Sequence, residues 1–216
     1  MHLSANKSIS ILFILFLILS MSILDAHPHM MFYPRMNFII NDDYCTGVEM
    51  DWEFDSMFSR SIIDGFDKNK NNLFETDEIK NIYDRAFLNL RNYHYFLVLQ
   101  TENDKFHPND ISEFSASQNN GKLFYHFLVS FEGLKLYQDF SLSIFDPTFF
   151  SAVSYKDEPV TFSSINTTKQ PTYEFKTDRG EPYYYDPQGA VEDTTVHKSW
   201  KPGLKTAYPE VLYVKF

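Results

Sequence analysis

Residues 67–78, with the sequence DKNKNNLFETDE, place an oxygen-bearing side chain at almost every second position and end on a glutamate. An EF-hand loop needs oxygen ligands at positions 1, 3, 5, 7, 9 and 12, because a calcium ion takes about six to eight oxygens and the last glutamate binds bidentately. Counted from the first aspartate, these positions are Asp67, Asn69, Asn71, the Leu73 carbonyl, Glu75 and Glu78. The spacing therefore predicts a calcium-binding loop.

Position 6 of such a loop is usually glycine, which makes the sharp turn, and here it is Asn72. Asparagine tolerates a positive φ better than most residues, so the loop can still close at some energetic cost. Only Asp67, Glu75 and Glu78 are charged, and no second loop of this kind is present in the sequence. We therefore expect modest affinity and a structural clip rather than a sensor, with an empty, degenerate loop as the alternative.

The N-terminus has the pattern of a secretory signal in residues 1–26. Lys7 precedes the short apolar run 9–20, and a small residue, Ala26, ends the segment. The apolar run is shorter than the ~20 residues of a spanning helix, so an uncleaved anchor is the less favoured alternative. The pattern predicts an exported, periplasmic protein that is not an integral membrane protein after signal cleavage.

Cleavage after residue 26 would place a free amine and an imidazole together on His27, with His29 two residues on. Imidazole ligands suit zinc, nickel and copper, so this terminus is a candidate transition-metal site. Pro28 has no amide N–H, which excludes the square-planar terminal motif that needs a deprotonated amide there. The alternatives are a disordered terminus or the start of a strand.

Composition limits the function classes. The net charge is -10 and Lys and Arg form no cluster, which argues against nucleic acid as a partner. The single cysteine, Cys45, cannot form an intramolecular disulfide, so a core rich in aromatic residues must stabilise the fold. No nucleophile with a nearby base and no phosphate-binding glycine loop can be found, so we expect a protein that is not an enzyme.

Hydrophobic periodicity predicts an α+β fold: an antiparallel, sandwich-like β-sheet with an inserted EF-hand-like helix-loop-helix. The expected helices are 55–66, with Asp55 as N-cap, and 76–92. The expected strands are 36–41, 47–54, 94–100, 122–131, 140–146 and 149–155. Residues 27–165 would form this domain, and 166–216 an irregular C-terminal extension that ends in a strand at 210–216.

Five stretches in this order resemble the family named domain of unknown function 1007: HPHMMF, DWEFDSMFS, DKNKNNLFETDEI, NYHYFLVL and SIFDPTFFSAVSY. The resemblance covers about residues 27–165. It implies a small exported bacterial protein, a periplasmic component of an ABC-type transport system, often encoded beside nickel/cobalt-type permeases. His27 and His29 match the family's HPH, and residues 67–78 match its calcium-like loop, except for Asn72 in place of the usual glycine.

Residues and resemblance together predict a periplasmic accessory protein for zinc, nickel or cobalt transport, with a structural calcium-type loop and an inner-membrane metal permease as partner. Two alternatives stay open. One is a calcium-stabilised exported structural or adhesion module, in which the histidines have no role. The other is a copper enzyme that uses the amine and imidazole of His27.

Overall fold

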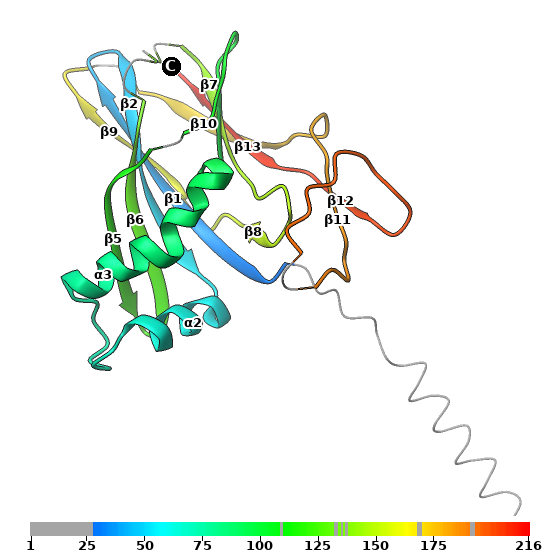
Figure 1. Cartoon of the computed structure of the whole chain (residues 1–216). Coiled ribbons are helices and arrows are strands. Elements are labelled where there is room, and N and C mark those ends of the chain that lie inside the picture. Colours follow the sequence, from blue (N-terminus) through cyan, green and yellow to red (C-terminus); the bar gives the residue numbers. More distant parts are fainter. Residues whose placement is uncertain are drawn as a thin grey trace, which may run out of the picture.

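The computed structural model describes residues 28–108, 110–131, 134, 136, 138–167, 170–190 and 193–216. The predicted signal segment, residues 1–26, and His27 lie outside these ranges. The strands form two larger β-sheets and a small two-stranded sheet, and the helices lie beside one of the larger sheets (Figure 1).

The first sheet has six strands, in the order β5-β6-β2-β1, with both β8 and β9 paired to β1. Its strands are β1 (Met30–Asn41), β2 (Tyr44–Phe54), β5 (Ser112–Asn119), β6 (Lys122–Ser130), β8 (Ser151–Val153) and β9 (Val160–Ile165). The β5, β6, β2 and β1 pairs are antiparallel, whereas β8 and β9 run parallel to β1. The sheet is therefore mixed at its β1 side.

The second sheet has five strands in the order β10-β13-β7-β3-β4, all antiparallel. Its strands are β3 (Leu97–Gln100), β4 (Lys105–Phe106), β7 (Phe140–Ile144), β10 (Thr172–Thr177) and β13 (Glu210–Lys215). The small sheet pairs β11 (Tyr183–Tyr185) with β12 (Lys205–Ala207).

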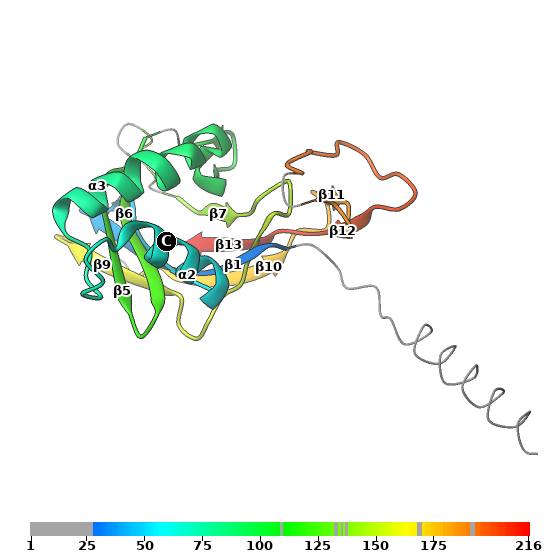
Figure 2. The same ribbon diagram turned by 60° about the horizontal axis from the view of Figure 1, so that its bottom comes forward.

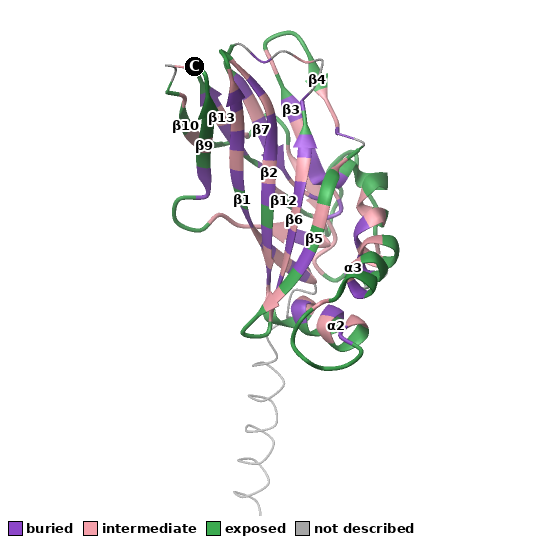
Figure 3. Ribbon diagram, turned by 90° about the vertical axis from the view of Figure 1, so that its left-hand side faces the viewer, coloured by how far each residue is buried: buried purple, intermediate pink, exposed green. Residues whose placement is uncertain are grey.

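Both larger sheets contribute to one hydrophobic core. In β1 the side chains alternate between buried and more exposed, as expected for a strand with one face in the core. Phe38 of β1 lies 5.6 Å from Phe140 of β7, measured between ring centroids, and Phe32 stacks on Trp52 at 4.3 Å. In Figure 3 buried and less buried residues alternate along the central strands, while the outer faces of the helices are exposed. The α+β class with largely antiparallel sheets is confirmed.

The helices lie on the side of the first sheet that carries β5 and β6 (Figures 1 and 2). They are α2 (Ser56–Phe66), α3 (Thr76–Ile82), a π-helix (Tyr83–Phe87) and a 3₁₀-helix (Leu88–Phe96). Among the described residues, no helix has the length and apolar character needed to cross a membrane. The starts of both predicted helices, at 55–56 and at 76, are as expected.

The predicted helix over 76–92 is present, but it is α-helical only as far as Ile82. The next turn is π-helical, and the Leu88 amide donates to the Tyr83 carbonyl five residues back. A turn of this width brings residues five apart towards the same side, and Ile82 and Phe87 are both fully buried. Burial of the large Phe87 ring against the sheet accounts for the departure from α-helical spacing.

The predicted strand 94–100 begins only at Leu97. Its first three residues, His94, Tyr95 and Phe96, have positive φ values of 51°, 52° and 60° and form a left-handed turn. Tyr95 and Phe96 are buried there, so tertiary packing overrides the strand propensity of this aromatic run.

The C-terminal segment is more ordered than its composition indicated. The expected last strand is present as β13, a central strand of the second sheet whose Leu212 and Val214 are fully buried. The same segment also contains β10, β11 and β12, in a region expected to be irregular. Strand β10 was not predicted because its side chains are all exposed or half-buried, which leaves no clear apolar alternation.

Candidate metal centre

Helix α2 leads into the predicted calcium loop and is fixed at its start. The Asp55 carboxylate accepts hydrogen bonds from the Met57 and Phe58 amides at 2.7 and 3.0 Å, as an N-cap does. Its second oxygen accepts from the Met31 amide at 2.6 Å. The first turn of α2 is thereby tied to β1.

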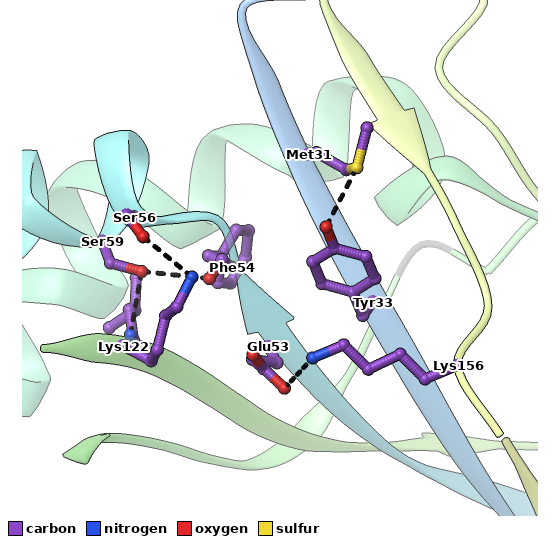
Figure 4. Close-up of polar contacts among 9 residues, drawn as sticks. Met31, Tyr33, Glu53, Phe54, Ser56, Ser59, Lys122 and Lys156 are labelled. Atoms are coloured by element: carbon purple, nitrogen blue, oxygen red, sulfur yellow. Dashed lines mark hydrogen bonds and ion pairs between the residues drawn. The ribbon is translucent and has the colours of Figure 1, made fainter. Parts of the chain in front are cut away.

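A second anchor holds α2 on β6. The fully buried Ser59 hydroxyl donates to the Phe54 carbonyl at 3.2 Å and accepts from the Leu123 amide at 3.0 Å. The Lys122 ammonium group donates to the Ser56 hydroxyl at 2.9 Å (Figure 4). These contacts fix the position at which the loop begins.

Asp67 ends α2 and is the first predicted ligand. Only 5% of it is exposed. Its Oδ2 atom accepts hydrogen bonds from the Asn72 amide at 3.1 Å and from the Gln118 side chain of β5 at 3.0 Å. Its Oδ1 atom is buried and has no hydrogen-bond partner among the described residues. A buried carboxylate oxygen without a partner costs free energy, so this atom points to a missing cation or donor.

The middle of the loop turns tightly around its own amides. The Asn69 side-chain oxygen accepts from the Asn71 amide at 2.9 Å, and the Asn71 oxygen accepts from the Leu73 amide at 2.8 Å. Each of these oxygens has a second lone pair that a cation can use. Asn72 has a φ of 65°, so the asparagine at position 6 adopts the left-handed conformation for which glycine is usual.

Glu75 and Glu78 close the loop at the start of α3. Glu78 is 9% exposed, and its two oxygens accept from the Lys68 and Glu75 amides at 2.7 and 3.1 Å. Glu75 is exposed and accepts from the side-chain amides of Asn71 at 2.6 Å and Asn69 at 3.2 Å. Hydrogen bonding with the Glu78 side chain, and then with these two amides, lowers the pKa of Glu75 to about 2. Glu75 is therefore a carboxylate anion at any physiological pH.

The structure thus brings several of the predicted loop ligands into mutual contact. Asp67 and Glu78, the first and last, are the buried pair, and the others lie on an exposed rim. In the described part of the chain, no three His, Cys, Asp or Glu side chains gather as a metal site of those types alone. The three predicted carboxylate ligands, Asp67, Glu75 and Glu78, therefore do not converge on one point in this structure, and amide and main-chain oxygens would supply the other half of the ligand set.

One contact of the candidate site could not be found in the sequence. Gln118 lies 51 positions from Asp67 and reaches it only because β5 is the strand at the edge of the sheet beside the loop. No motif relates a strand glutamine to a distant loop, so only the sheet pairing shows this contact. It links the predicted site directly to the sheet.

Of the two predicted transition-metal ligands, only His29 can be placed, because His27 lies outside the described residues. The His29 amide donates to the Phe150 carbonyl at 2.9 Å, and its half-buried ring lies 5.2 Å from the Phe150 ring. This histidine is therefore held immediately before β1.

Two further imidazoles lie together. The ring centroids of His94 and His107 are 4.9 Å apart. Burial, and then the neighbouring His94, lowers the pKa of His107, which favours its neutral form. Protein zinc sites use three or four ligands, and the described residues bring no third His, Cys, Asp or Glu to this pair, so we assign no metal to it.

A comparison with models of protein families shows to which family the chain is related. The family model described as "Protein of unknown function (DUF1007)" matches residues 12–216. The chain belongs to this family. The DUF1007 match includes the loop and its two helices. It is longer than the segment 27–165 in which the sequence resemblance lies, and it continues as far as the last strand. No curated protein matches the sequence.

Proposed function

We propose that residues 67–78 form an EF-hand-like loop that binds one calcium ion and clips α2 and α3 to the β5 edge of the first sheet. The observation that carries this proposal is the buried, unpartnered Oδ1 atom of Asp67 at the first ligand position. A calcium ion there would supply the missing positive partner. The remaining ligands would be Asn69, Asn71, the Leu73 carbonyl, Glu75 and Glu78.

The backbone supports this assignment. Lys70 and Asn72, at positions 4 and 6, both have positive φ, at 60° and 65°. Such strain in two non-glycine residues persists only where the surroundings require it. With three carboxylates in the ligand set, affinity falls in the range of extracellular modules, ~10⁻⁴ to 10⁻³ M.

The wider role of the protein in this proposal is that of an exported, periplasmic accessory component for transition-metal transport. His27 and His29 would take zinc, nickel or copper as cargo and present it to an inner-membrane permease. Imidazole nitrogens and carboxylate oxygens prefer different metals, so the two sites would not compete. The support is the pair of histidines before β1 together with the family resemblance.

Calorimetric titration with calcium tests the loop. Wild type should bind one ion, and Asp67→Asn should weaken binding at least about 10-fold, since a buried charged ligand is lost. The control is Asp64→Asn, the same chemical change on an exposed α2 residue that pairs with Arg60 at 3.3 Å, which should bind as wild type does. Equal affinity in Asp67→Asn and wild type would refute the site.

The transition-metal role has its own test. Replacing both His27 and His29 with alanine should abolish zinc, nickel and copper binding, while the melting shift caused by calcium remains. Loss of both properties together would contradict two separate sites. Retention of transition-metal binding would remove the N-terminal histidines as ligands, whereas no transition-metal binding in the wild type would favour the calcium-stabilised module.

A further inference from the structure

A second candidate site lies between the helices and the first sheet. It is a cavity of about 240 Å³. Most of its lining is aromatic or aliphatic, and includes Phe58 and Ile62 of α2, Leu90 of the 3₁₀-helix and Phe54 of β2. An engineered cavity of about 150 Å³ with such a lining binds benzene, so by the same ratio this one holds about ten non-hydrogen atoms.

One residue of the wall carries a buried polar group without a partner among the described residues. Tyr125 of β6 lines the cavity and is 2% exposed, and its hydroxyl is buried with no hydrogen-bond partner in the part of the chain that the structure describes. Burial raises the pKa of this hydroxyl, so it stays a protonated donor. A ligand that brings one acceptor would remove the cost of the unpaired donor.

Two unusual backbone segments form part of the same wall. Ala86 and Phe87 come from the π-helix, and Phe96 from the left-handed turn with three consecutive positive φ values. Single π-helical turns occur frequently at functional sites, and strained backbone persists where a function or its surroundings require it. Both departures from regular structure therefore deliver side chains to one cavity.

The charge at the cavity selects against anions. Asp146 lines it and is 3% exposed, and its carboxylate accepts from the Thr148 amide and hydroxyl at 2.9 and 2.7 Å and from the Ser151 amide at 3.0 Å. These donors are all neutral, so the negative charge is hydrogen-bonded without a counter-ion in these contacts. A second negative charge close to it would be repelled at low dielectric.

We propose that this cavity binds a small neutral organic molecule of about ten non-hydrogen atoms, with an aromatic or short aliphatic body and one carbonyl- or ether-type acceptor for the Tyr125 hydroxyl. This site is separate from the metal loop and does not depend on calcium binding there. It adds an organic ligand to a protein otherwise interpreted through its metal ligands.

Three probes of similar size test the proposal by NMR titration of the purified protein. Acetophenone has the apolar ring and a neutral acceptor, ethylbenzene lacks the acceptor, and benzoate carries a charge. Acetophenone should shift the methyl signals of Ile62, Ala86 and Leu90 at millimolar or lower concentration. Ethylbenzene should bind several-fold more weakly at the same methyl groups, and benzoate should leave them unchanged.

Two variants separate the hydroxyl from the cavity. Tyr125→Phe should weaken acetophenone binding about 3- to 10-fold and leave ethylbenzene binding unchanged, because only the hydrogen bond is lost. Ala86→Leu fills the cavity with a good helix former and should abolish binding of both, whereas the exposed Asn89→Ala on the 3₁₀-helix should bind as wild type does.

Three results would overturn the proposal: no shift of these methyl signals at the solubility limit of acetophenone, benzoate binding as tight as acetophenone binding, or an equal loss for both neutral probes in Tyr125→Phe. The last would show that the hydroxyl acts through the fold and not through a ligand. Because Tyr125→Phe removes a single atom, it keeps the test valid even if Ala86→Leu fails to fold.

Discussion

At the scale of single residues, Asp67 is the centre of the proposed metal site. Its Oδ2 atom is satisfied by a loop amide and by Gln118, while Oδ1 is buried without a partner. Without a partner that oxygen costs free energy, and in the proposed site calcium would take it as a ligand. The same atom therefore accounts for both a cost to stability and a gain on binding.

Substitutions at Asn72 test how much stability the loop loses because position 6 is not glycine. Glycine adopts the φ of 65° found at this position more easily than asparagine does. Alanine adopts it less easily than either residue. In saturating calcium, Asn72→Gly should raise the free energy of unfolding by about 1 kcal/mol, and Asn72→Ala should lower it by about 1 kcal/mol. Chemical denaturation measures both. Changes of the same sign would show that the turn is not under conformational strain.

The lowered pKa of Glu75 predicts that the stability of the protein depends on pH. This pKa is lowered from 4.5 to about 2 by hydrogen bonding with Glu78, Asn71 and Asn69. Since the folded pKa is below the unfolded one, its stabilisation is present above pH 4.5 and is lost as pH falls from about 4.5 to 2. With a calcium chelator present, the melting temperature of Glu75→Gln should therefore fall less than that of wild type as the pH is lowered through this window.

A matched variant controls for general acid effects. Glu102→Gln changes a glutamate in the turn between β3 and β4, and should follow the wild-type curve. If Glu75→Gln also follows that curve, then the hydrogen bonds on the loop do not stabilise the ionised carboxylate.

At the scale of elements, α2 depends on its first turn. Asp55 caps the helix and also accepts from Met31 of β1, so Asp55→Ala removes the cap and leaves a strand amide without this partner. We expect a loss of about 1–2 kcal/mol in the free energy of unfolding, or about 2–8 °C in melting temperature. The exposed Asp64→Ala on the same helix should change stability by less than about 0.5 kcal/mol. If Asp55→Ala also changed the free energy of unfolding by less than about 0.5 kcal/mol, the cap would not stabilise α2.

The elements that could be predicted from the sequence are those with a strong local signal. The cap at Asp55, the helix start at Thr76 and the apolar alternation in β2 and β6 all follow from neighbouring residues. The π-helix could not be predicted, because it follows from how Phe87 meets the sheet. Strand β5 was missed for a related reason: it is an edge strand, and only Ala116 in it is buried.

At the scale of the whole molecule, sheet pairing determines what the sequence could not show. β13, at the end of the chain, lies between β7 and β10, and β9 runs parallel to β1 although more than 100 residues separate them. Contacts of this range, such as that of Gln118 with Asp67, depend on the complete fold. The proposed loop ligands, by contrast, lie within twelve residues, so spacing alone is enough to propose them.

Calcium should stabilise the whole fold, because the loop joins helices that pack on the sheet. A ligand at 100 times its dissociation constant adds about 2.7 kcal/mol to the free energy of unfolding. For a chain of this size that is about 5–10 °C in melting temperature, which differential scanning calorimetry measures. Magnesium should give a smaller shift, because it needs a stricter octahedral geometry. Equal shifts with both ions would indicate a non-specific effect of divalent charge.

The most direct test of the calcium site is a crystal structure from crystals grown in calcium, with an anomalous difference map that locates the ion. We predict one peak in the loop, about 2.3–2.6 Å from Asp67 Oδ1 and from both carboxylate oxygens of Glu78. Asn69, Asn71, the Leu73 carbonyl and Glu75 would complete the coordination. An ordered loop without a peak at saturating calcium, or a peak that does not contact Asp67 Oδ1, would contradict the account.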